Sequence, residues 1–259
     1  MQRAINSIRL QTFENYYHVI VNDGGNAEAL DNLLLDIDDK RIVVIHNSSS
    51  LGMESASNIG LKYMKAKYAV IHDDDDTWQP DFLMECVNYL NSNAHVVGVV
   101  SNIMQCFEST ENNNVRAVGQ RLYNPAVKTF LRDDFLVTNQ FVPIAFLYRY
   151  DLHLTVGFYN EALSVCGDLE FFLRILSEHQ IGKISKCLAN YHIRVDSHHY
   201  DYQNSVSDTV KHLNHSTDVL ARLDDRNAPR KLKSWLRVKI YYRFCNILLR
   251  LLNRLGYFK

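Results

Sequence analysis

The chain has 259 residues, enough for one large domain or for a domain with an appendage. Apolar residues make up 47% of it, which excludes a disordered chain, and a net charge of −1 argues against a nucleic-acid partner. Its five cysteines are far apart and form no CxxC pair, a pattern typical of reduced thiols in a cytosolic protein. No apolar run approaches the roughly 18 residues of a membrane-spanning helix.

Strands and helices alternate along the first hundred residues. Helices are expected over 3–12, 26–36, 54–66 and 80–90, the last opened by Pro80. Apolar runs predict strands over 17–21, 41–45, 68–71 and 96–100, and the first of them ends in the turn signal Asn22-Asp23-Gly24-Gly25. This alternation predicts an α/β fold with a mostly parallel sheet and helices on both faces.

Acidic residues follow two of these strands. Asp23 comes after the first strand, and the consecutive aspartates Asp73–Asp76 come after the third. Ligands bind at the carboxyl ends of strands in such sheets, so this position favours a metal or ligand site over a solvated loop. Mg²⁺ or Mn²⁺ suits clustered carboxylates and can bridge them to a diphosphate. The sequence contains no P-loop and no GxGxxG pattern.

The second half of the chain is less regular. Short strands and loops are expected over 101–165, a helix with a buried apolar side over 167–179, and another helix over 204–224. The tail from Arg230 contains nine Lys or Arg, no Asp or Glu, and one apolar side. This pattern predicts contact with an anionic membrane surface, and the alternative is a helix packed on the domain or on a partner subunit.

Five motifs occur in the order SIRLQTF, HVIVNDGG, SNIGL, YAVIHDDDDTWQPDFL and CGDLEFFLRI. Together they resemble the inverting glycosyltransferases of family 2, over about residues 3–200. The resemblance implies a GT-A domain, with a Rossmann-like sheet, over 1–203. Its nucleotide-sugar half would span about 1–100, its acceptor half 101–203, and a helical extension 204–259.

The resemblance also implies an activity. The enzyme would be an inverting hexosyltransferase. It would transfer a sugar from a nucleotide-sugar donor, expected to be UDP-linked, to a glycan or lipid-linked acceptor. The cofactor would be Mn²⁺ or Mg²⁺. The location would be cytoplasmic, with peripheral contact at the inner face of the plasma membrane.

Individual roles follow from the same resemblance. Asp168 would be the general base that deprotonates the acceptor, and Asp23 would contact the nucleotide base. The other implied residues all serve the metal and the diphosphate: Asp73 and Asp75 as metal ligands, Asp74 and Asp76 beside them, and Arg194, His198 and His199 in a diphosphate-contacting loop.

Plainer interpretations remain open for several of these residues. Asp168 could merely be the N-cap of a helix that begins near Leu169, and Asp23 could have no role beyond forming its turn. His198 and His199 could be surface residues of a loop. Structural roles are favoured for the remaining candidates: Glu170 at a helix start, Arg174 in a salt bridge, and Trp78, Phe171 and Phe172 in the core.

The family normally opens with a strand that precedes the helix holding Ser7 and Gln11, and this chain begins inside or just before that helix. We expect edges of neighbouring strands to lack a partner as a result. Adding upstream residues, if the gene encodes them, should raise stability and nucleotide affinity. Two other functions stay open: a non-catalytic GT-A subunit in a polysaccharide-synthesis complex, and a nucleotidyltransferase.

Overall fold

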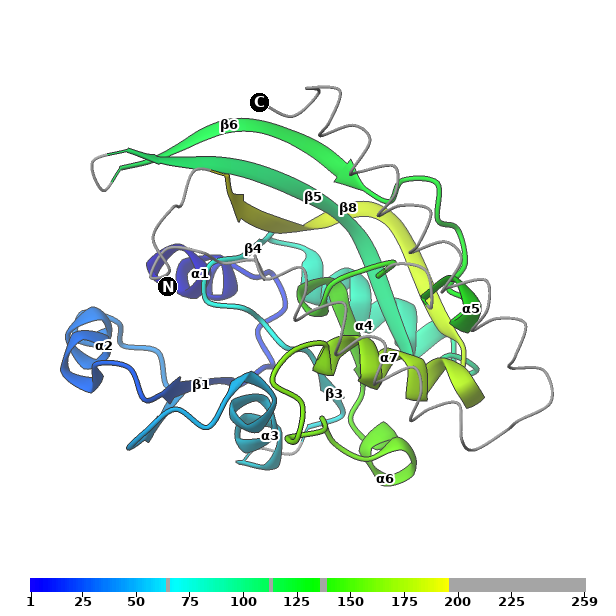
Figure 1. Cartoon of the computed structure of the whole chain (residues 1–259), viewed down its shortest axis with the longest axis horizontal. Helices are drawn as coiled ribbons and strands as arrows, with labels where there is room; N and C mark the ends of the chain where they lie inside the picture. The colour runs from blue at the N-terminus through cyan, green and yellow to red at the C-terminus, as the bar shows by residue number, and fades with distance from the viewer. Residues whose placement is uncertain (64–65, 112–113, 136–138, 196–259) are drawn as a thin grey trace, which may run out of the picture.

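A computed structural model describes residues 1–63, 66–111, 114–135 and 139–195 (Figure 1). The helical extension over 204–259, with its basic tail, lies outside these residues. The helices are α1 (Gln2–Arg9), α2 (Ala27–Leu34), α3 (Met53–Tyr63), α4 (Phe82–Ser92), α5 (Arg132–Phe135), α6 (Leu152–Val156) and α7 (Gly167–Glu178), with a 3₁₀ turn over Pro143–Ala145. The strands are β1 (His18–Asp23), β2 (Ile42–Asn47), β3 (Tyr68–Ala69), β4 (Thr77–Trp78), β5 (Gly98–Glu111), β6 (Asn114–Tyr123), β7 (Phe146–Arg149) and β8 (Ile181–Arg194).

The first hundred residues follow the predicted alternation. β1 and β2 pair in parallel, with His18 opposite Ile42, and α2 connects them. The side chain of Asn26 starts α2 by accepting a hydrogen bond from the amide of Ala29 at 3.0 Å. Pro80 lies just ahead of α4, whose N-cap is Asp81, so the proline precedes that helix and does not open its first turn.

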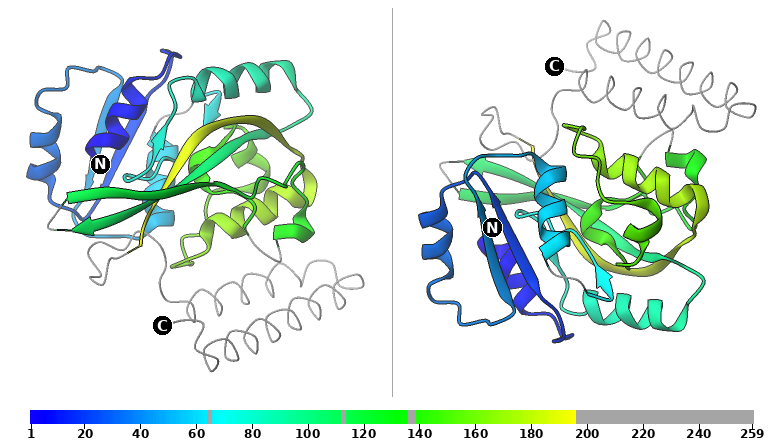
Figure 2. Two further views of the ribbon diagram at one scale, coloured as in Figure 1. Left: turned by 90° about the horizontal axis from the view of Figure 1, so that it is seen from above. Right: turned by 90° about the horizontal axis from the view of Figure 1, so that it is seen from below.

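A six-stranded sheet carries most of the remaining chain, in the order β3-β7-β5-β8-β4, with β6 paired to β5. The α/β class is confirmed, with helices beside a curled sheet (Figure 2). The strand directions differ from a mostly parallel sheet, because β5 and β8 are the parallel pair and the other pairs are antiparallel. For β6 the cause is local, because it returns against β5 through a short turn, which antiparallel pairing allows.

The hairpin of β5 and β6 corrects the expectation of short strands and loops over 101–165. β5 alone runs for 14 residues. The positions that it buries include Ser101, Gln105 and Glu108. A strand is recognised in sequence by alternating apolar residues, so these inward polar side chains conceal it.

Five strands, β1, β2, β3, β4 and β6, each pair with one neighbour only within the described residues. β1 pairs with β2 alone, and β3 pairs with β7 alone, so the two sheets are separate. Open sheets always have such edges, so the expectation about a strand ahead of α1 stays a prediction.

The main core lies between the six-stranded sheet and the helices α4 and α7. Phe171 and Phe172 are fully buried, as predicted, and Phe172 packs 4.4 Å from the ring of Phe141. Trp78 is buried too; it stacks on Phe82 and donates a hydrogen bond to the carbonyl of Ile144 at 2.8 Å. Among the described helices, none has both the length and the apolar character needed to cross a membrane.

Candidate active site

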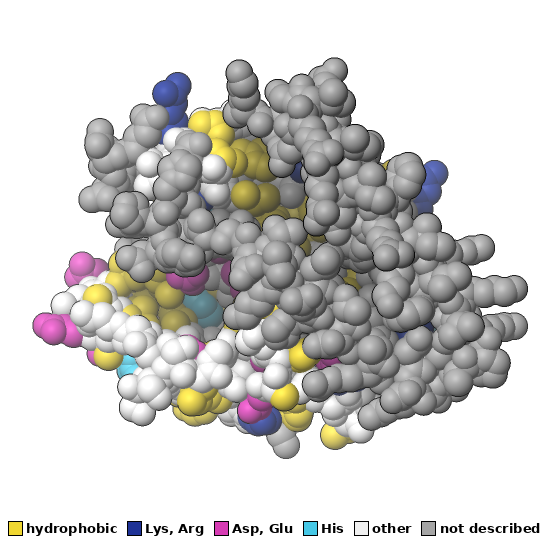
Figure 3. Space-filling view, in the orientation of Figure 1, with side chains coloured by type: hydrophobic (Ala, Val, Ile, Leu, Met, Phe, Trp, Pro, Cys, Tyr) yellow, Lys and Arg dark blue, Asp and Glu magenta, His cyan; other side chains and the backbone are white. Residues whose placement is uncertain are grey.

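The aspartate run forms the loop between β3 and β4. Asp74 is exposed, Asp73 and Asp75 are half-buried, and Asp76 is fully buried. Within the described part of the chain, no group donates a hydrogen bond to the carboxylate of Asp73 or Asp75. These two carboxylates therefore keep their acceptor positions for a ligand. In the space-filling view, acidic side chains and a histidine lie close together among the described residues (Figure 3).

Asp73 and Asp168 lie close together in space. Burial raises the pKa of Asp73 to about 7, and the negative charges of Asp75, Asp168 and Asp74 add to that shift. The contribution of Asp168 is informative, because that residue lies on α7, far away in sequence. The structure therefore brings the aspartate run and the predicted general base into one site.

Tyr159 lies near both acidic groups, and Tyr123 lies near Asp168. The pKa of Tyr159 is raised well above its usual value by burial and by Tyr148, Asp168 and Asp73. Tyr123, on β6, also has its pKa raised by burial and by Asp168. These rings give the space around Asp168 a partly apolar wall.

Asp168 lies within the first turn of α7 and does not cap it. The helix begins at Gly167, and its N-cap is Cys166, which has a left-handed backbone (φ 63°). The carboxylate of Asp168 accepts a hydrogen bond from the side-chain amide of Asn139 at 3.2 Å. The interpretation of Asp168 as a mere cap is therefore wrong, whereas its role as a base stays a prediction.

A second carboxyl supports the start of α7. Glu54, on α3, is buried, and its Oε1 accepts a hydrogen bond from the amide of Gly167 at 3.2 Å. Burial raises the pKa of Glu54, although its hydrogen bonds from backbone amides oppose that rise. A Cβ atom on Gly167 would lie 2.3 Å from this oxygen, so only glycine leaves room for Glu54.

Asp76 has a different environment from its neighbours. Its Oδ1 accepts a hydrogen bond from the amide of His192 on β8 at 2.8 Å, whereas its buried Oδ2 has no partner within the described residues. Burial, then the charge of Asp73, raises its pKa to about 9, so this environment favours the neutral form of Asp76. Its contact with a cofactor stays a prediction.

Asp23 holds the loop that follows β2. It accepts hydrogen bonds from the side chains of Asn47 and Ser50 and from the amides of Leu51 and Gly52, at 2.8–3.0 Å. Partial burial alone would raise the pKa of Asp23, but these bonds together lower it to about 2. Asp23 is thus an ionised anchor between β1 and the loop, and its contact with a nucleotide base remains a prediction.

The remaining predicted residues lie at or beyond the end of β8. Arg194 is the last residue of that strand, with its Cα opposite Glu108 of β5. His198 and His199 lie outside the described residues.

Arg174 pairs with Glu170 at 2.8 Å, four residues apart on α7, which confirms the predicted structural salt bridge.

The aspartate loop suits a divalent cation. Among the described residues, no three Asp, Glu, His or Cys side chains converge on one point, so the chain offers no complete coordination cage. Magnesium-type sites commonly use one or two carboxylates, with water and substrate phosphates as the other ligands. Asp73 and Asp75 fit that requirement, because their carboxylate oxygens accept no hydrogen bond from the described residues. Burial and the charges of Asp75, Asp168 and Asp74 raise the pKa of Asp73, and a cation would offset that rise.

Four supporting residues were missed by sequence analysis. Arg3, Glu108 and His192 contact the aspartate loop or its neighbours, and Glu54 contacts the start of α7. Each is a single polar residue in a helix or strand, with no motif around it. Their contacts across the fold, and for Glu54 and Glu108 their burial, identify them.

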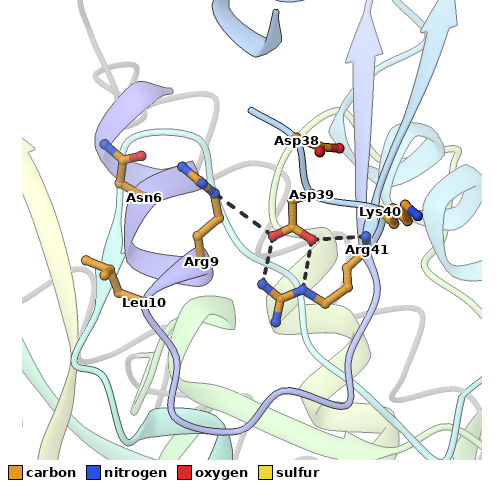
Figure 4. A pocket seen from close by; sticks show the side chains of 7 residues that line it. All are labelled: Asn6, Arg9, Leu10, Asp38, Asp39, Lys40 and Arg41. Carbon is orange, nitrogen blue, oxygen red and sulfur yellow. Dashed lines mark hydrogen bonds and ion pairs between the residues drawn. The ribbon is translucent and has the colours of Figure 1, made fainter. Parts of the chain in front are cut away.

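A cavity of about 460 Å³ lies elsewhere, between α1 and the loop before β2 (Figure 4). In it Asp39 pairs with Arg41 at 2.7 Å and approaches Arg9 at 4.0 Å. None of the predicted site residues lines it. Its lining consists of Asn6, Arg9, Leu10, Asp38, Asp39, Lys40 and Arg41.

Comparison with known proteins identifies relatives over much of the chain. The family model described as Glycosyl transferase family 2 matches residues 1–154. An uncharacterized glycosyltransferase of Haemophilus influenzae is 35% identical over 102 residues, which is 39% of this chain and 32% of that protein. The uncharacterized glycosyltransferase YwdF of Bacillus subtilis is 26% identical over 187 residues, 70% of this chain and 64% of YwdF. The chain thus spans less than two thirds of either relative.

Solved structures share the fold. The mannosyltransferase PcManGT of Pyrobaculum calidifontis, in complex with GDP-Man and Mn²⁺, has a TM-score of 0.61 and 14% identity, covering 92% of this chain and 64% of PcManGT. Residues 1–349 of S. aureus TarS, in complex with UDP-GlcNAc, have a TM-score of 0.59 and 16% identity, covering 91% of this chain and 74% of that one.

Proposed function

This chain belongs to Glycosyl transferase family 2, and on that premise we propose that it transfers a sugar from a nucleotide-sugar donor to an acceptor hydroxyl, with inversion and with a divalent metal. The observation that carries the proposal is the proximity of two acidic groups. Burial and then Asp75 raise the pKa of Asp73 most, and Asp168 lies near enough to contribute as well. One substrate could therefore contact both groups.

Asp73 and Asp75 would hold Mn²⁺ or Mg²⁺. When bound, the metal would offset the negative charge that grows on the departing diphosphate, which is larger in the transition state than in the bound donor. The two carboxylates would orient the diphosphate at the loop after β3. Mutual repulsion among the acidic residues would fall at the same time.

Asp168 would act on the acceptor. Its carboxylate would take the proton of the acceptor hydroxyl as that oxygen forms a bond to the anomeric carbon and the bond to the diphosphate breaks. A single displacement of this kind inverts the configuration of the sugar. The hydrogen bond from Asn139 at 3.2 Å would hold the carboxylate toward the acceptor.

The donor and the acceptor can be proposed as chemical classes. Solved structures with this fold contain UDP-GlcNAc or GDP-Man, which supports a nucleoside diphosphate-linked donor. A UDP-linked sugar is the first choice. The putative colanic acid biosynthesis glycosyl transferase WcaA of Escherichia coli, 33% identical over 82 residues, supports a glycan acceptor in polysaccharide synthesis. A lipid-linked acceptor and contact with the cytoplasmic membrane face are part of the proposal on the basis of the basic, amphipathic tail sequence alone.

A donor screen with and without Mn²⁺, reading release of nucleoside diphosphate, tests the proposal. Asp75→Asn should abolish the metal dependence and most of the turnover. Asp168→Asn should keep the donor Kd while turnover falls by about 10²-fold or more, the usual contribution of a general base. Asp36→Asn, at an exposed acidic side chain away from the site, is the control.

Three results would contradict this assignment. Normal turnover of Asp168→Asn would show that another group removes the proton. Donor binding with no turnover under any condition would favour the non-catalytic subunit. Release of pyrophosphate from a nucleoside triphosphate would favour the nucleotidyltransferase.

A further inference from the structure

A series of hydrogen bonds begins and ends on the loop that carries the aspartates. Arg3, on α1, donates from Nε and Nη2 to the backbone carbonyl of Asp75 at 3.0 and 2.8 Å. The same guanidinium donates to both oxygens of Glu108, on β5, at 2.6 and 2.9 Å. This paired geometry is the strong form of an arginine–carboxylate contact.

The series returns to the loop through β8. Nδ1 of His192 lies 2.7 Å from Oε1 of Glu108, and its Nε2 lies 3.0 Å from the hydroxyl of Thr77. An ionised carboxylate only accepts, so Nδ1 carries the proton; in a neutral ring, Nε2 then accepts from Thr77. Asn190 donates to the same hydroxyl at 3.1 Å, so the Thr77 hydroxyl donates one hydrogen bond and accepts another.

Glu108 is the centre of this arrangement. It is a buried carboxyl on β5, and the side chain of His192 is also largely buried. Burial alone would raise the pKa of Glu108, but hydrogen bonds from Arg3 and His192 outweigh it and lower that pKa. An ionised, buried carboxylate with donors on two sides is a fixed point between α1 and β8.

We propose that Arg3, Glu108 and His192 form a positioning network that fixes the backbone of Asp75–Thr77, so that the carboxylates of Asp73 and Asp75 are preorganised for a divalent cation. The network contacts the loop at three points: the Asp75 carbonyl, the Thr77 hydroxyl, and Asp76 through the amide of His192. None of the three contacts uses the carboxylate of Asp73 or Asp75. The proposal rests on the proposed function, since it concerns the same metal site.

Partners that orient metal ligands usually change metal affinity when they are removed. The test is therefore a titration with Mn²⁺ in the presence of UDP, with free Mn²⁺ read by electron paramagnetic resonance and folding read by thermal unfolding. Arg3→Met removes the donors at one end of the network and keeps the apolar stem. Thr77→Val removes the hydroxyl at the other end and keeps the shape.

Each single variant should raise the Kd for Mn²⁺ by about tenfold. The double variant should raise it by clearly less than the product of the two single effects, because both act through one connected unit. Arg3→Lys keeps the charge but loses the fork that reaches Glu108 and the Asp75 carbonyl together, so it should give an intermediate Kd. Arg9→Met is the matched control on α1, since the contact of Arg9 is with Asp39, away from the loop.

The outcomes separate the two proposals. An unchanged Kd for Mn²⁺ in folded Arg3→Met and Thr77→Val would overturn the network while leaving the metal site standing. Fully multiplicative effects would show two independent contacts and would overturn the network as well. If Arg3→Met does not fold, Arg3→Lys and Thr77→Val decide in the same way. Absence of Mn²⁺ binding in the unaltered chain would overturn the proposed function, and the network's role with it.

Discussion

At the residue scale, the lack of a side chain at Gly167, one position before the proposed base, leaves room for Glu54. An added Cβ would lie 2.3 Å from Oε1 and 2.4 Å from Cγ of Glu54, closer than atoms tolerate. Gly167→Ala should therefore displace the buried Glu54 and lower the free energy of unfolding by about 1–3 kcal/mol, as overpacking does. Turnover should fall as well, because the first turn of α7 carries Asp168.

Gly119→Ala is the matched control for this change. Gly119 lies on β6, and a Cβ there would meet nothing within 4 Å. Urea unfolding and donor turnover of the two variants give the comparison. Equal stability of Gly167→Ala and Gly119→Ala would show that Glu54 yields without cost, and that its contact with the amide of Gly167 does not position α7.

At the element scale, the carboxylate of Asp23 ties the end of β1 to the loop after β2. Its pKa of about 2 lies below the ordinary value for an aspartate, so the folded state favours the ionised form. The stabilisation is therefore complete above about pH 4 and is lost as the pH falls toward 2. Asp23→Asn should lower the free energy of unfolding at pH 7 by about 1 kcal/mol, the typical net value of a hydrogen bond.

The pH dependence distinguishes this anchor from a general effect of charge. The difference in stability between the unaltered chain and Asp23→Asn should shrink between pH 4 and pH 2, as measured by urea unfolding at each pH. Asp36→Asn should show no such convergence, because its exposed side chain holds no loop. A difference that stayed constant down to pH 2 would argue against the ionised anchor.

Sequence alone predicts those elements whose apolar residues follow a regular period. The alternation over the first hundred residues was visible because β1 and β2 are apolar runs with turn signals after them. The predicted strand over 96–100 ends well before β5 does, because the buried side of β5 includes the polar residues Gln105 and Glu108. Strand partners could not be predicted either, since pairing depends on contacts between segments far apart in the chain.

At the scale of the whole molecule, the site depends on bringing two distant segments together. Asp73 lies after β3 and Asp168 lies on α7, and the strands β4 to β7 lie between these two elements along the chain. The motif order in the sequence indicated both acids but not their proximity. Nor did it indicate the network around Glu108, whose members come from α1, β5 and β8.

The most direct test of the central claim is a crystal structure of the chain with UDP and Mn²⁺, in which anomalous scattering locates the metal. We expect one Mn²⁺ within coordination distance of a carboxylate oxygen of Asp73 or Asp75 and of the UDP diphosphate. Asp168 should face the same cavity from the opposite side, where the acceptor would enter. A metal bound away from the aspartate loop, or an Asp168 side chain separated from the diphosphate by the protein wall, would contradict the account.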